Sequence, residues 1–183
     1  QNYMDWKKMS SLRLLNETTA SAVTSVSITD VFTSDFDIYK IVIKEFYQTG
    51  TTTRNLQFRF INSAGSVISS NDYENAVASM NSFGTTDELR STSADGIENY
   101  FFDTEDEEQG AGGVFYIFTP TNSSLYTFFI GEGVNFNDGN GATTYKGIGV
   151  LQKAVSVKGI NFVISGDTIE RFKVSVYGLR VDS

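Results

Sequence analysis

Apolar and polar side chains alternate with a period of two along most of this 183-residue chain, and this alternation restricts the fold class more than any other feature. In the stretch DIYKIVIKEFY, the residues Tyr39, Ile41 and Ile43 fall on one side of an extended strand, and Lys40 and Lys44 fall on the other. The pattern predicts a strand with one buried face and one face in water.

Two further segments repeat the pattern. In LQFRFI, the apolar residues Leu56, Phe58 and Phe60 are expected to point inward, with Gln57 and Arg59 outward. The linker QTGTTTRN has the composition of a hairpin turn, so we expect this strand to be the antiparallel partner of the strand before it. The stretch GINFVISGDTIERFKVSVYGLR predicts a strand, a turn at Gly166 and a second strand, which together form a closing hairpin.

The remaining segments differ in how clearly they alternate. Residues 1–11 have no settled period and are interpreted as an N-terminal arm or linker, before a single domain over residues 12–183. YENAVASM fits two turns of helix or an edge strand, and its surroundings favour the strand. VFYIFT and LYTFFIG are apolar on both faces, which predicts central strands or strands covered by another chain. NFNDGNGATTYKG is interpreted as a long polar loop.

About nine or ten short strands, separated by turn residues at intervals of roughly 8 to 12 residues, indicate an all-β protein. The composition agrees, because 15 Phe and 9 Tyr favour strands and 16 Gly supply turns. We therefore predict an antiparallel β-sandwich with a jelly-roll arrangement.

Several classes of function are excluded by what the chain lacks. It has no Cys and no His, which removes disulfides, thiol nucleophiles, Ser-His-Asp triads and the usual zinc ligands. We expect no cofactor and no metal. The net charge of −8 argues against a nucleic-acid partner. No apolar run approaches the ~18 to 20 residues that span a bilayer, so we expect no membrane insertion.

Two polar stretches are candidate sites, one for a cation and the other for a cation or a sugar. The first is the acidic run within residues 104–109, and the second is the Asn/Gly-rich stretch 135–141. Neither has the ligand spacing of a calcium loop, so a solvated loop is the favoured interpretation of both, and their roles stay open. The oxygen donors concerned are Glu105, Asp106, Glu107, Glu108, Asn135, Asn137, Asp138 and Asn140.

Two further sets of side chains, a pair of aspartates and five tyrosines, support more specific hypotheses about function. Asp35 and Asp37 could form the carboxylate pair of a glycosidase, but their place at the entrance of a strand favours turn formation, and we predict no enzyme activity. Five tyrosines near expected loop ends could stack on sugars or could be ordinary sandwich residues. They are Tyr47, Tyr73, Tyr100, Tyr126 and Tyr145.

Four stretches, taken in order, resemble a known module. They are LRLLNETTASAVTSVSITDVFTSDFDIYKIVI, LQFRF, SVISSNDYENA and KGINFVISGDTIERFKVSVYGLR, with YGL at Tyr177 to Leu179. Together they frame nearly the whole chain and are similar to the β-sandwich module of tailed-phage, particularly marine-phage, virion surface proteins of the tail-fibre or capsid-decoration type. Many modules of this kind carry a second glycine after the last turn, where this chain has Glu170, Arg171 and Phe172.

The resemblance implies a viral structural protein at the virion surface, with other virion proteins as partners. It also implies a homo-oligomer, for which a trimer is the first expectation. The doubly apolar strands at 114–118 and 125–130 fit this role, because a face not needed for the core can pack against symmetry mates. The alternative is a receptor- or carbohydrate-binding module for host surface glycans. Capsid and tail locations both stay open.

Overall fold

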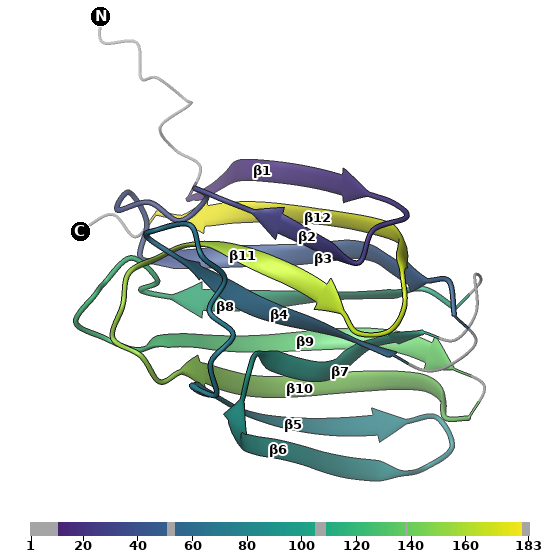
Figure 1. Cartoon of the computed structure of the whole chain (residues 1–183). Helices are drawn as coiled ribbons and strands as arrows, with labels where there is room; N and C mark the ends of the chain where they lie inside the picture. The colour runs from purple at the N-terminus through teal and green to yellow at the C-terminus, as the bar shows by residue number, and fades with distance from the viewer. Residues whose placement is uncertain (1–10, 51–53, 105–108, 138, 181–183) are drawn as a thin grey trace, which may run out of the picture.

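The computed structural model describes residues 11–50, 54–104, 109–137 and 139–180, with the side chains of 98–104 and 137 excepted. Within these residues the chain forms two antiparallel sheets that face each other (Figure 1). The strands are β1 (Leu12–Ala20), β2 (Ser25–Ile28), β3 (Ile38–Gln48), β4 (Arg54–Asn62), β5 (Tyr73–Asn81), β6 (Thr86–Ala94), β7 (Ile97–Thr104), β8 (Ala111–Phe118), β9 (Thr127–Asn137), β10 (Gly141–Leu151), β11 (Val157–Ile164) and β12 (Ile169–Leu179).

Eight of these strands form a jelly roll. The pairs β1–β12, β2–β11, β3–β8 and β4–β7 are all antiparallel, as in one long ribbon of paired strands. Folding this ribbon places successive pairs alternately in the two sheets, which gives the orders β1-β12-β3-β8 and β2-β11-β4-β7. The predicted all-β, jelly-roll-like sandwich is confirmed.

The other four strands are two hairpins inserted into the jelly roll. The β5–β6 hairpin follows β4, and the β9–β10 hairpin follows β8. β10 pairs with β5, so the hairpins extend one sheet in the order β8-β9-β10-β5-β6. One sheet therefore has eight described strands and the other has four. The β5–β6 end reaches beyond the small sheet (Figure 1).

Aromatic rings fill the space between the sheets. Phe58 of the small sheet stacks on Phe115 of the large sheet, with ring centroids 5.0 Å apart, and meets Phe129 edge-on at 5.2 Å. Phe162 packs against Phe172 at 5.0 Å. The residues predicted to point inward are buried, which confirms the alternation in β3 and β4. They are Tyr39, Ile41, Ile43, Leu56, Phe58 and Phe60.

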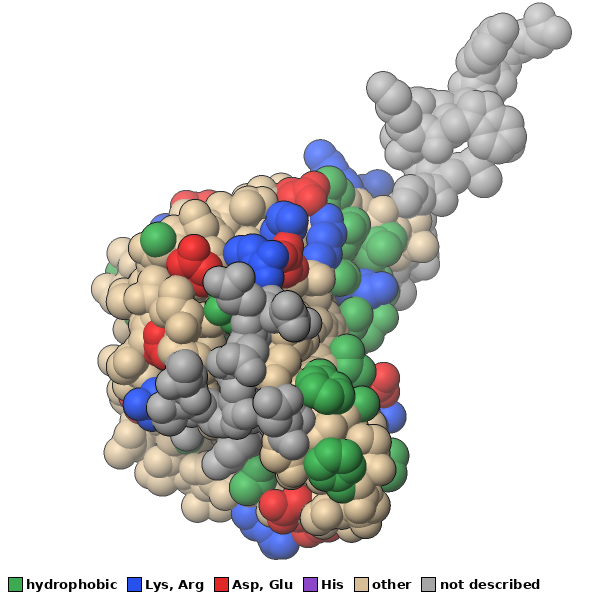
Figure 2. Space-filling view, turned by 90° about the vertical axis from the view of Figure 1, so that its right-hand side faces the viewer, with side chains coloured by type: hydrophobic (Ala, Val, Ile, Leu, Met, Phe, Trp, Pro, Cys, Tyr) green, Lys and Arg blue, Asp and Glu red, His purple; other side chains and the backbone are tan. Residues whose placement is uncertain are grey.

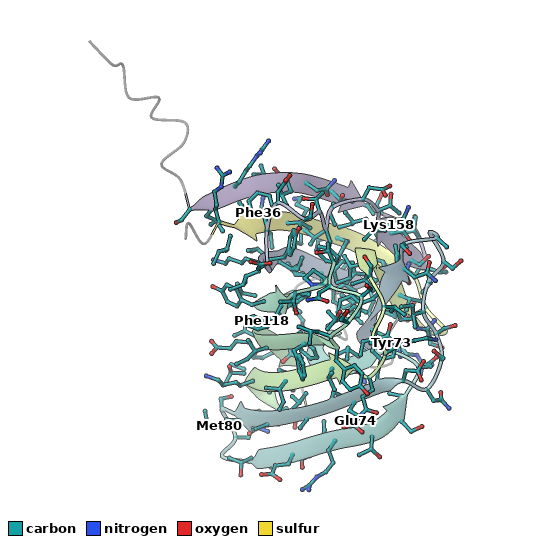
Figure 3. The ribbon with its side chains drawn as sticks, turned by 90° about the vertical axis from the view of Figure 1, so that its left-hand side faces the viewer. Phe36, Tyr73, Glu74, Met80, Phe118 and Lys158 are labelled. Atoms are coloured by element: carbon teal, nitrogen blue, oxygen red, sulfur yellow. The ribbon has the colours of Figure 1, made fainter. Side chains whose placement is uncertain are left out.

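One buried hydroxyl group connects the two sheets. The Tyr73 hydroxyl accepts a hydrogen bond from the Phe60 backbone N–H and donates one to the Ile68 carbonyl, both at 2.9 Å. Figure 3 shows Tyr73 on the side of the large sheet that faces the small one. Burial raises the pKa of the Tyr73 hydroxyl above its usual value, and the hydrogen bond from Phe60 only partly offsets this.

Two predicted pairings are wrong. β3 and β4 are not hairpin partners, because β3 pairs with β12 and β8 while β4 pairs with β11 and β7 in the other sheet. β11 and β12 also lie in different sheets, so the chain does not end on a hairpin. Alternation specifies which side chains point inward. It does not specify the partner of a strand, because two strands that face each other across a sandwich show the same alternation as two strands that are hydrogen-bonded in one sheet.

The predicted number of strands is too low, since the described residues contain twelve. β6 was missed because its side chains are nearly all polar and exposed, and it therefore has no inward apolar set. The stretch NFNDGNGATTYKG is mostly strand, since β9 ends at Asn137 and β10 begins at Gly141. YENAVASM lies in β5, as favoured. Residues 1–10 of the predicted arm lie outside the described residues.

Candidate functional site: an apolar face on the eight-stranded sheet

The usual alternation is reversed around the middle of β9 and of β10. Ile130 and Ile148 point away from the small sheet, whereas Gly131, Gly147 and Gly149 point toward it. In a sheet with one face in water, the large apolar residues belong inside and polar residues outside. Ile130 and Ile148 stand on the open face although Phe129 of β9 is buried on the inner side, so the two strands supply more apolar surface than the core uses.

Six exposed residues define what we call the apolar outer face. They are Met80, Phe128, Ile130, Val134, Phe136 and Ile148, and between 38% and 60% of each is exposed. They lie on one side of the sheet, because Phe128 is directly opposite Phe118 on β8, and Ile130 is directly opposite Ile148 on β10. In Figure 2 hydrophobic side chains gather along the right-hand side of the molecule, and Figure 3 shows Phe118 and Met80 on the side away from the small sheet.

A trough runs over β5 beside these residues. Its floor is low because Ala76 and Ala78 are the outward residues there. Ile130 and Ile148 stand on one side of the trough, and Arg90 of the edge strand β6 stands on the other. Two adjoining cavities of about 380 and about 420 Å³ make up the trough. The outer face therefore has a raised part on β9 and β10 and a hollow part on β5.

Charged side chains on this surface form ion pairs within the chain. Lys146 Nζ lies 3.0 Å from Glu132 Oε1, across β9 and β10. Arg90 Nη2 lies 3.1 Å from Glu88 Oε2 on β6. Farther along the sheet, the Lys40 ammonium lies 6.0 Å from the ring centroid of Tyr116. A partner that covers this surface would therefore meet two acids that already have basic neighbours, and also Glu74, which lines the trough.

A second hollow, of about 590 Å³, lies on the outer side of the small sheet and is polar. Arg59 forms an ion pair with Asp95, and Gln57 Nε2 donates a hydrogen bond to Asp95 Oδ1 at 2.9 Å. Asn55 Oδ1 and Arg59 Nε line the same region and are buried, and neither atom has a hydrogen-bond partner in the described part of the chain. This surface offers amide and guanidinium groups rather than apolar ones.

Of the oxygen donors predicted within residues 135–141, the two that the structure describes, Asn135 and Asn140, bond to different neighbours. Asn135 is buried on the inner side of β9, where its Nδ2 donates to Tyr145 Oη at 3.5 Å. Asn140 lies in the turn and its Oδ1 accepts from Asn81 Nδ2 at 3.4 Å. The interpretation of this stretch as one loop is wrong. Among the residues that the structure describes, no three acidic side chains gather where they could hold a metal ion.

The acidic residues Glu105 to Glu108, the Asn137 side chain and Asp138 lie outside the described residues. Asp35 and Asp37 lie in the connection between β2 and β3, as expected of turn residues. Asp35 Oδ2 accepts a hydrogen bond from Thr33 Oγ1 at 3.3 Å, and the Asp37 carbonyl accepts one from the Thr119 N–H at 2.7 Å.

Of the two interpretations of the five tyrosines, that of ordinary sandwich residues fits three of them. Tyr47, Tyr73 and Tyr145 are buried, so their ring faces are not available to a sugar. Tyr126 is 45% exposed, just before β9. The Tyr100 side chain lies outside the described residues.

The sequence indicated the doubly apolar strands, but the first part of β10 was assigned to a loop and the trough was not predicted. The signal that was available is the repeat of glycine at every second position, at Gly131 and Gly133 and again at Gly147 and Gly149. Glycine at inward positions leaves the apolar residues between them on the opposite face. No sequence pattern indicated the trough, because the trough depends on β5 lying beside β10.

Comparisons with known proteins give no family. No family model matches the chain, and no curated protein matches it. One solved structure that it matches is a fructofuranosidase from Schwanniomyces occidentalis, with 10% sequence identity and a TM-score of 0.25. That match covers 93% of this chain and 34% of the fructofuranosidase, so the chain spans about a third of the enzyme's length. The described residues contain no helix long and apolar enough to cross a membrane.

Proposed function

We propose that this chain is a phage virion structural protein, an exposed module of the capsid-decoration or tail-fibre type that acts through surface contacts and not through catalysis. The observation that supports contact is the apolar outer face of the eight-stranded sheet. The virion location rests on the sequence resemblance. The jelly roll is used by viral capsid and lectin domains, which is compatible with the proposal at the level of fold only.

The exposed apolar residues support a contact role through their number and their placement. Soluble monomers rarely expose continuous apolar patches larger than a few hundred Å². Phe128, Ile130 and Ile148 stand side by side on neighbouring strands, and Val134 and Phe136 continue the patch along β9. Covering such a patch stabilises a complex by roughly 25 cal/mol for each Å² of apolar surface removed from water.

Particles provide the test of this function. The expected result is that this chain is found by mass spectrometry in purified phage particles, at a constant number of copies per particle. An antibody against the chain should decorate the capsid or the tail in electron micrographs, which also decides between these two locations. Presence of the chain in infected-cell lysate but not in purified particles would refute the proposal.

The alternative function, a carbohydrate-binding module for host surface glycans, is favoured by one observation. The polar hollow on the small sheet is lined by the side chains of Asn55, Gln57 and Arg59, and sugar hydroxyl groups pair with amide and guanidinium groups of this kind. A panel of bacterial surface glycans tests this function. Binding should be lost in Asn55→Ala and kept in Ile130→Asp, and binding that neither substitution changes would contradict a site in this hollow.

A further inference from the structure

We propose that the apolar outer face binds the same face of a second copy of this chain, in a two-fold symmetric pair. The proposal deepens the function given above, since it rests on a contact role for this surface and names the partner.

The relief of the surface is complementary to itself. β10 lies at the centre of the five strands β8-β9-β10-β5-β6, with the raised residues of β9 on one side and the trough over β5 on the other. A second copy, turned about a two-fold axis along β10, would place Phe128 and Ile130 over the trough of the first. The same rotation places the first copy's raised residues over the trough of the second. The contact between the raised residues of one copy and the trough of the other is therefore made twice in each pair.

The five-strand surface that a pair would cover, which includes the apolar outer face on β5, β9 and β10, is large enough for a stable pair. Five strands spaced about 4.8 Å apart give a width of about 24 Å, and the nine residues from Phe128 to Phe136 give a length of about 30 Å. The product is about 700 Å² for each copy, close to the roughly 800 Å² per partner of a standard stable interface. Face-to-face packing of sheets is also a common way to bury such surfaces.

The charges on this surface allow a second copy to approach. The chain carries a net charge of −8, but on this surface Glu132 is paired with Lys146 and Glu88 with Arg90. Glu74 lines the same cavity of the trough as Arg90, so this acid also has a basic side chain nearby. An axis along β10 brings the two Lys146 side chains of a pair near each other. Each Lys146 keeps its own Glu132, so neither lysine enters the interface without an acid beside it.

The symmetry follows from the number of apolar faces. A two-fold pair uses one face twice, whereas the trimer implied by the resemblance needs two different surfaces on each copy. The described residues carry one extended apolar face, because the outward side of the small sheet is polar around Gln57, Arg59 and Asn161. A pair is therefore the assembly that this surface favours.

The first experiment measures molar mass by light scattering on a sizing column, over a hundredfold range of concentration. The full chain should have twice the 20.2 kDa mass of one copy. Ile130→Asp should reduce the mass to that of one copy. Val67→Asp is the matched control, since Val67 is also a β-branched residue that is 38% exposed, but it lies beside β4 of the small sheet.

The second experiment uses the absence of cysteine from the chain. In Ile148→Cys, a short bismaleimide can join the thiol only to the thiol of another copy, and the residue lies close to the proposed axis. We expect most of the protein to become covalently linked pairs. Val67→Cys should give less than a tenth of that yield.

The outcomes separate this inference from the function on which it rests. A wild-type mass of one copy or of three copies overturns the pair, and so does a pair that Ile130→Asp leaves intact. Circular dichroism shows whether Ile130→Asp is folded. If it is not, the cross-linking yield of Ile148→Cys decides. A single-copy mass together with presence of the chain in particles refutes the inference and leaves the virion function standing. A two-copy mass together with absence of the chain from particles refutes the virion function and leaves the inference standing.

Discussion

The Phe129 ring lies over Gly149 on the inner side of the eight-stranded sheet, and a Cβ added at Gly149 would come within 1.9 Å of the ring's Cε1. The ring of β9 thus fills the space that a β10 side chain would otherwise occupy. Gly131 has a similar role, since a Cβ there would lie 2.6 Å from Phe115 Cβ. A few aromatic rings therefore cover the inner side of β9 and β10.

Gly149→Ala should destabilise the protein by about 1 to 3 kcal/mol, because the added methyl group forces the Phe129 ring and the nearby Glu74 carbonyl to move. Chemical denaturation monitored by circular dichroism measures the change. Gly110→Ala is the control, since the nearest atom to its added Cβ is 4.0 Å away and little change is expected. Equal stability of the two variants would contradict close packing at Gly149.

Phe128→Asp and Phe129→Asp should have opposite consequences, although the residues are neighbours. Phe129 is 3% exposed and packs against Phe58, so a carboxylate there should prevent folding. Phe128 is 51% exposed, so its variant should fold and lose the proposed pairing. Circular dichroism and light scattering measure the two results. A folded Phe129→Asp would show that the inner side of β9 is not in the core.

Tyr73→Phe should reduce the free energy of unfolding by about 1 to 3 kcal/mol, because the buried Phe60 N–H loses its acceptor. The hydrogen bond to the Ile68 carbonyl is lost at the same time. Tyr126→Phe is the matched control, since Tyr126 is 45% exposed and water can replace its partners. Denaturation by urea gives both values, and a loss of the same size in both variants would argue against the buried bridge.

Stability should fall as the pH rises above about 10, where a tyrosine in the unfolded chain loses its proton. Burial raises the pKa of Tyr73 and of Tyr39 in the folded protein. The unfolded chain therefore binds fewer protons than the folded chain in this range, which favours unfolding. Tyr73→Phe should make the fall less steep. Urea denaturation at several pH values between about 9 and 11 measures it, and identical slopes for wild type and variant would contradict this contribution of Tyr73.

The fold class could be predicted from the sequence because burial acts on every second residue. Tyr39, Ile41 and Ile43 show this in β3, and the inward residues of β11 and β12 show it again. The partner of each strand could not be predicted in this way. Ile160 of β11 and Phe172 of β12 are equally buried, but they belong to different sheets. The hydrophobic effect has no direction and does not distinguish a neighbour in a sheet from one across the core.

The candidate site was only partly predictable. The apolar character of Phe128 and Ile130 was visible in the sequence and indicated a covered or central strand. The contribution of Ala76 and Ala78 was not visible, since small residues on a strand carry no pattern of their own. Their effect depends on Ile148 standing beside them, and this in turn depends on the pairing of β5 with β10.

The pairing of β5 with β10 also affects the order in which the surface can form during synthesis. Val77 lies opposite Gly147, so the β5–β6 hairpin is made long before the strand that receives it. Closure of such a distant contact is slow compared with that of local hairpins. The trough and the raised residues come together only after β9 and β10 have been made. Nascent chains that have not passed β10 therefore do not yet carry the complete contact surface, and only chains that extend beyond Leu151 can associate through it.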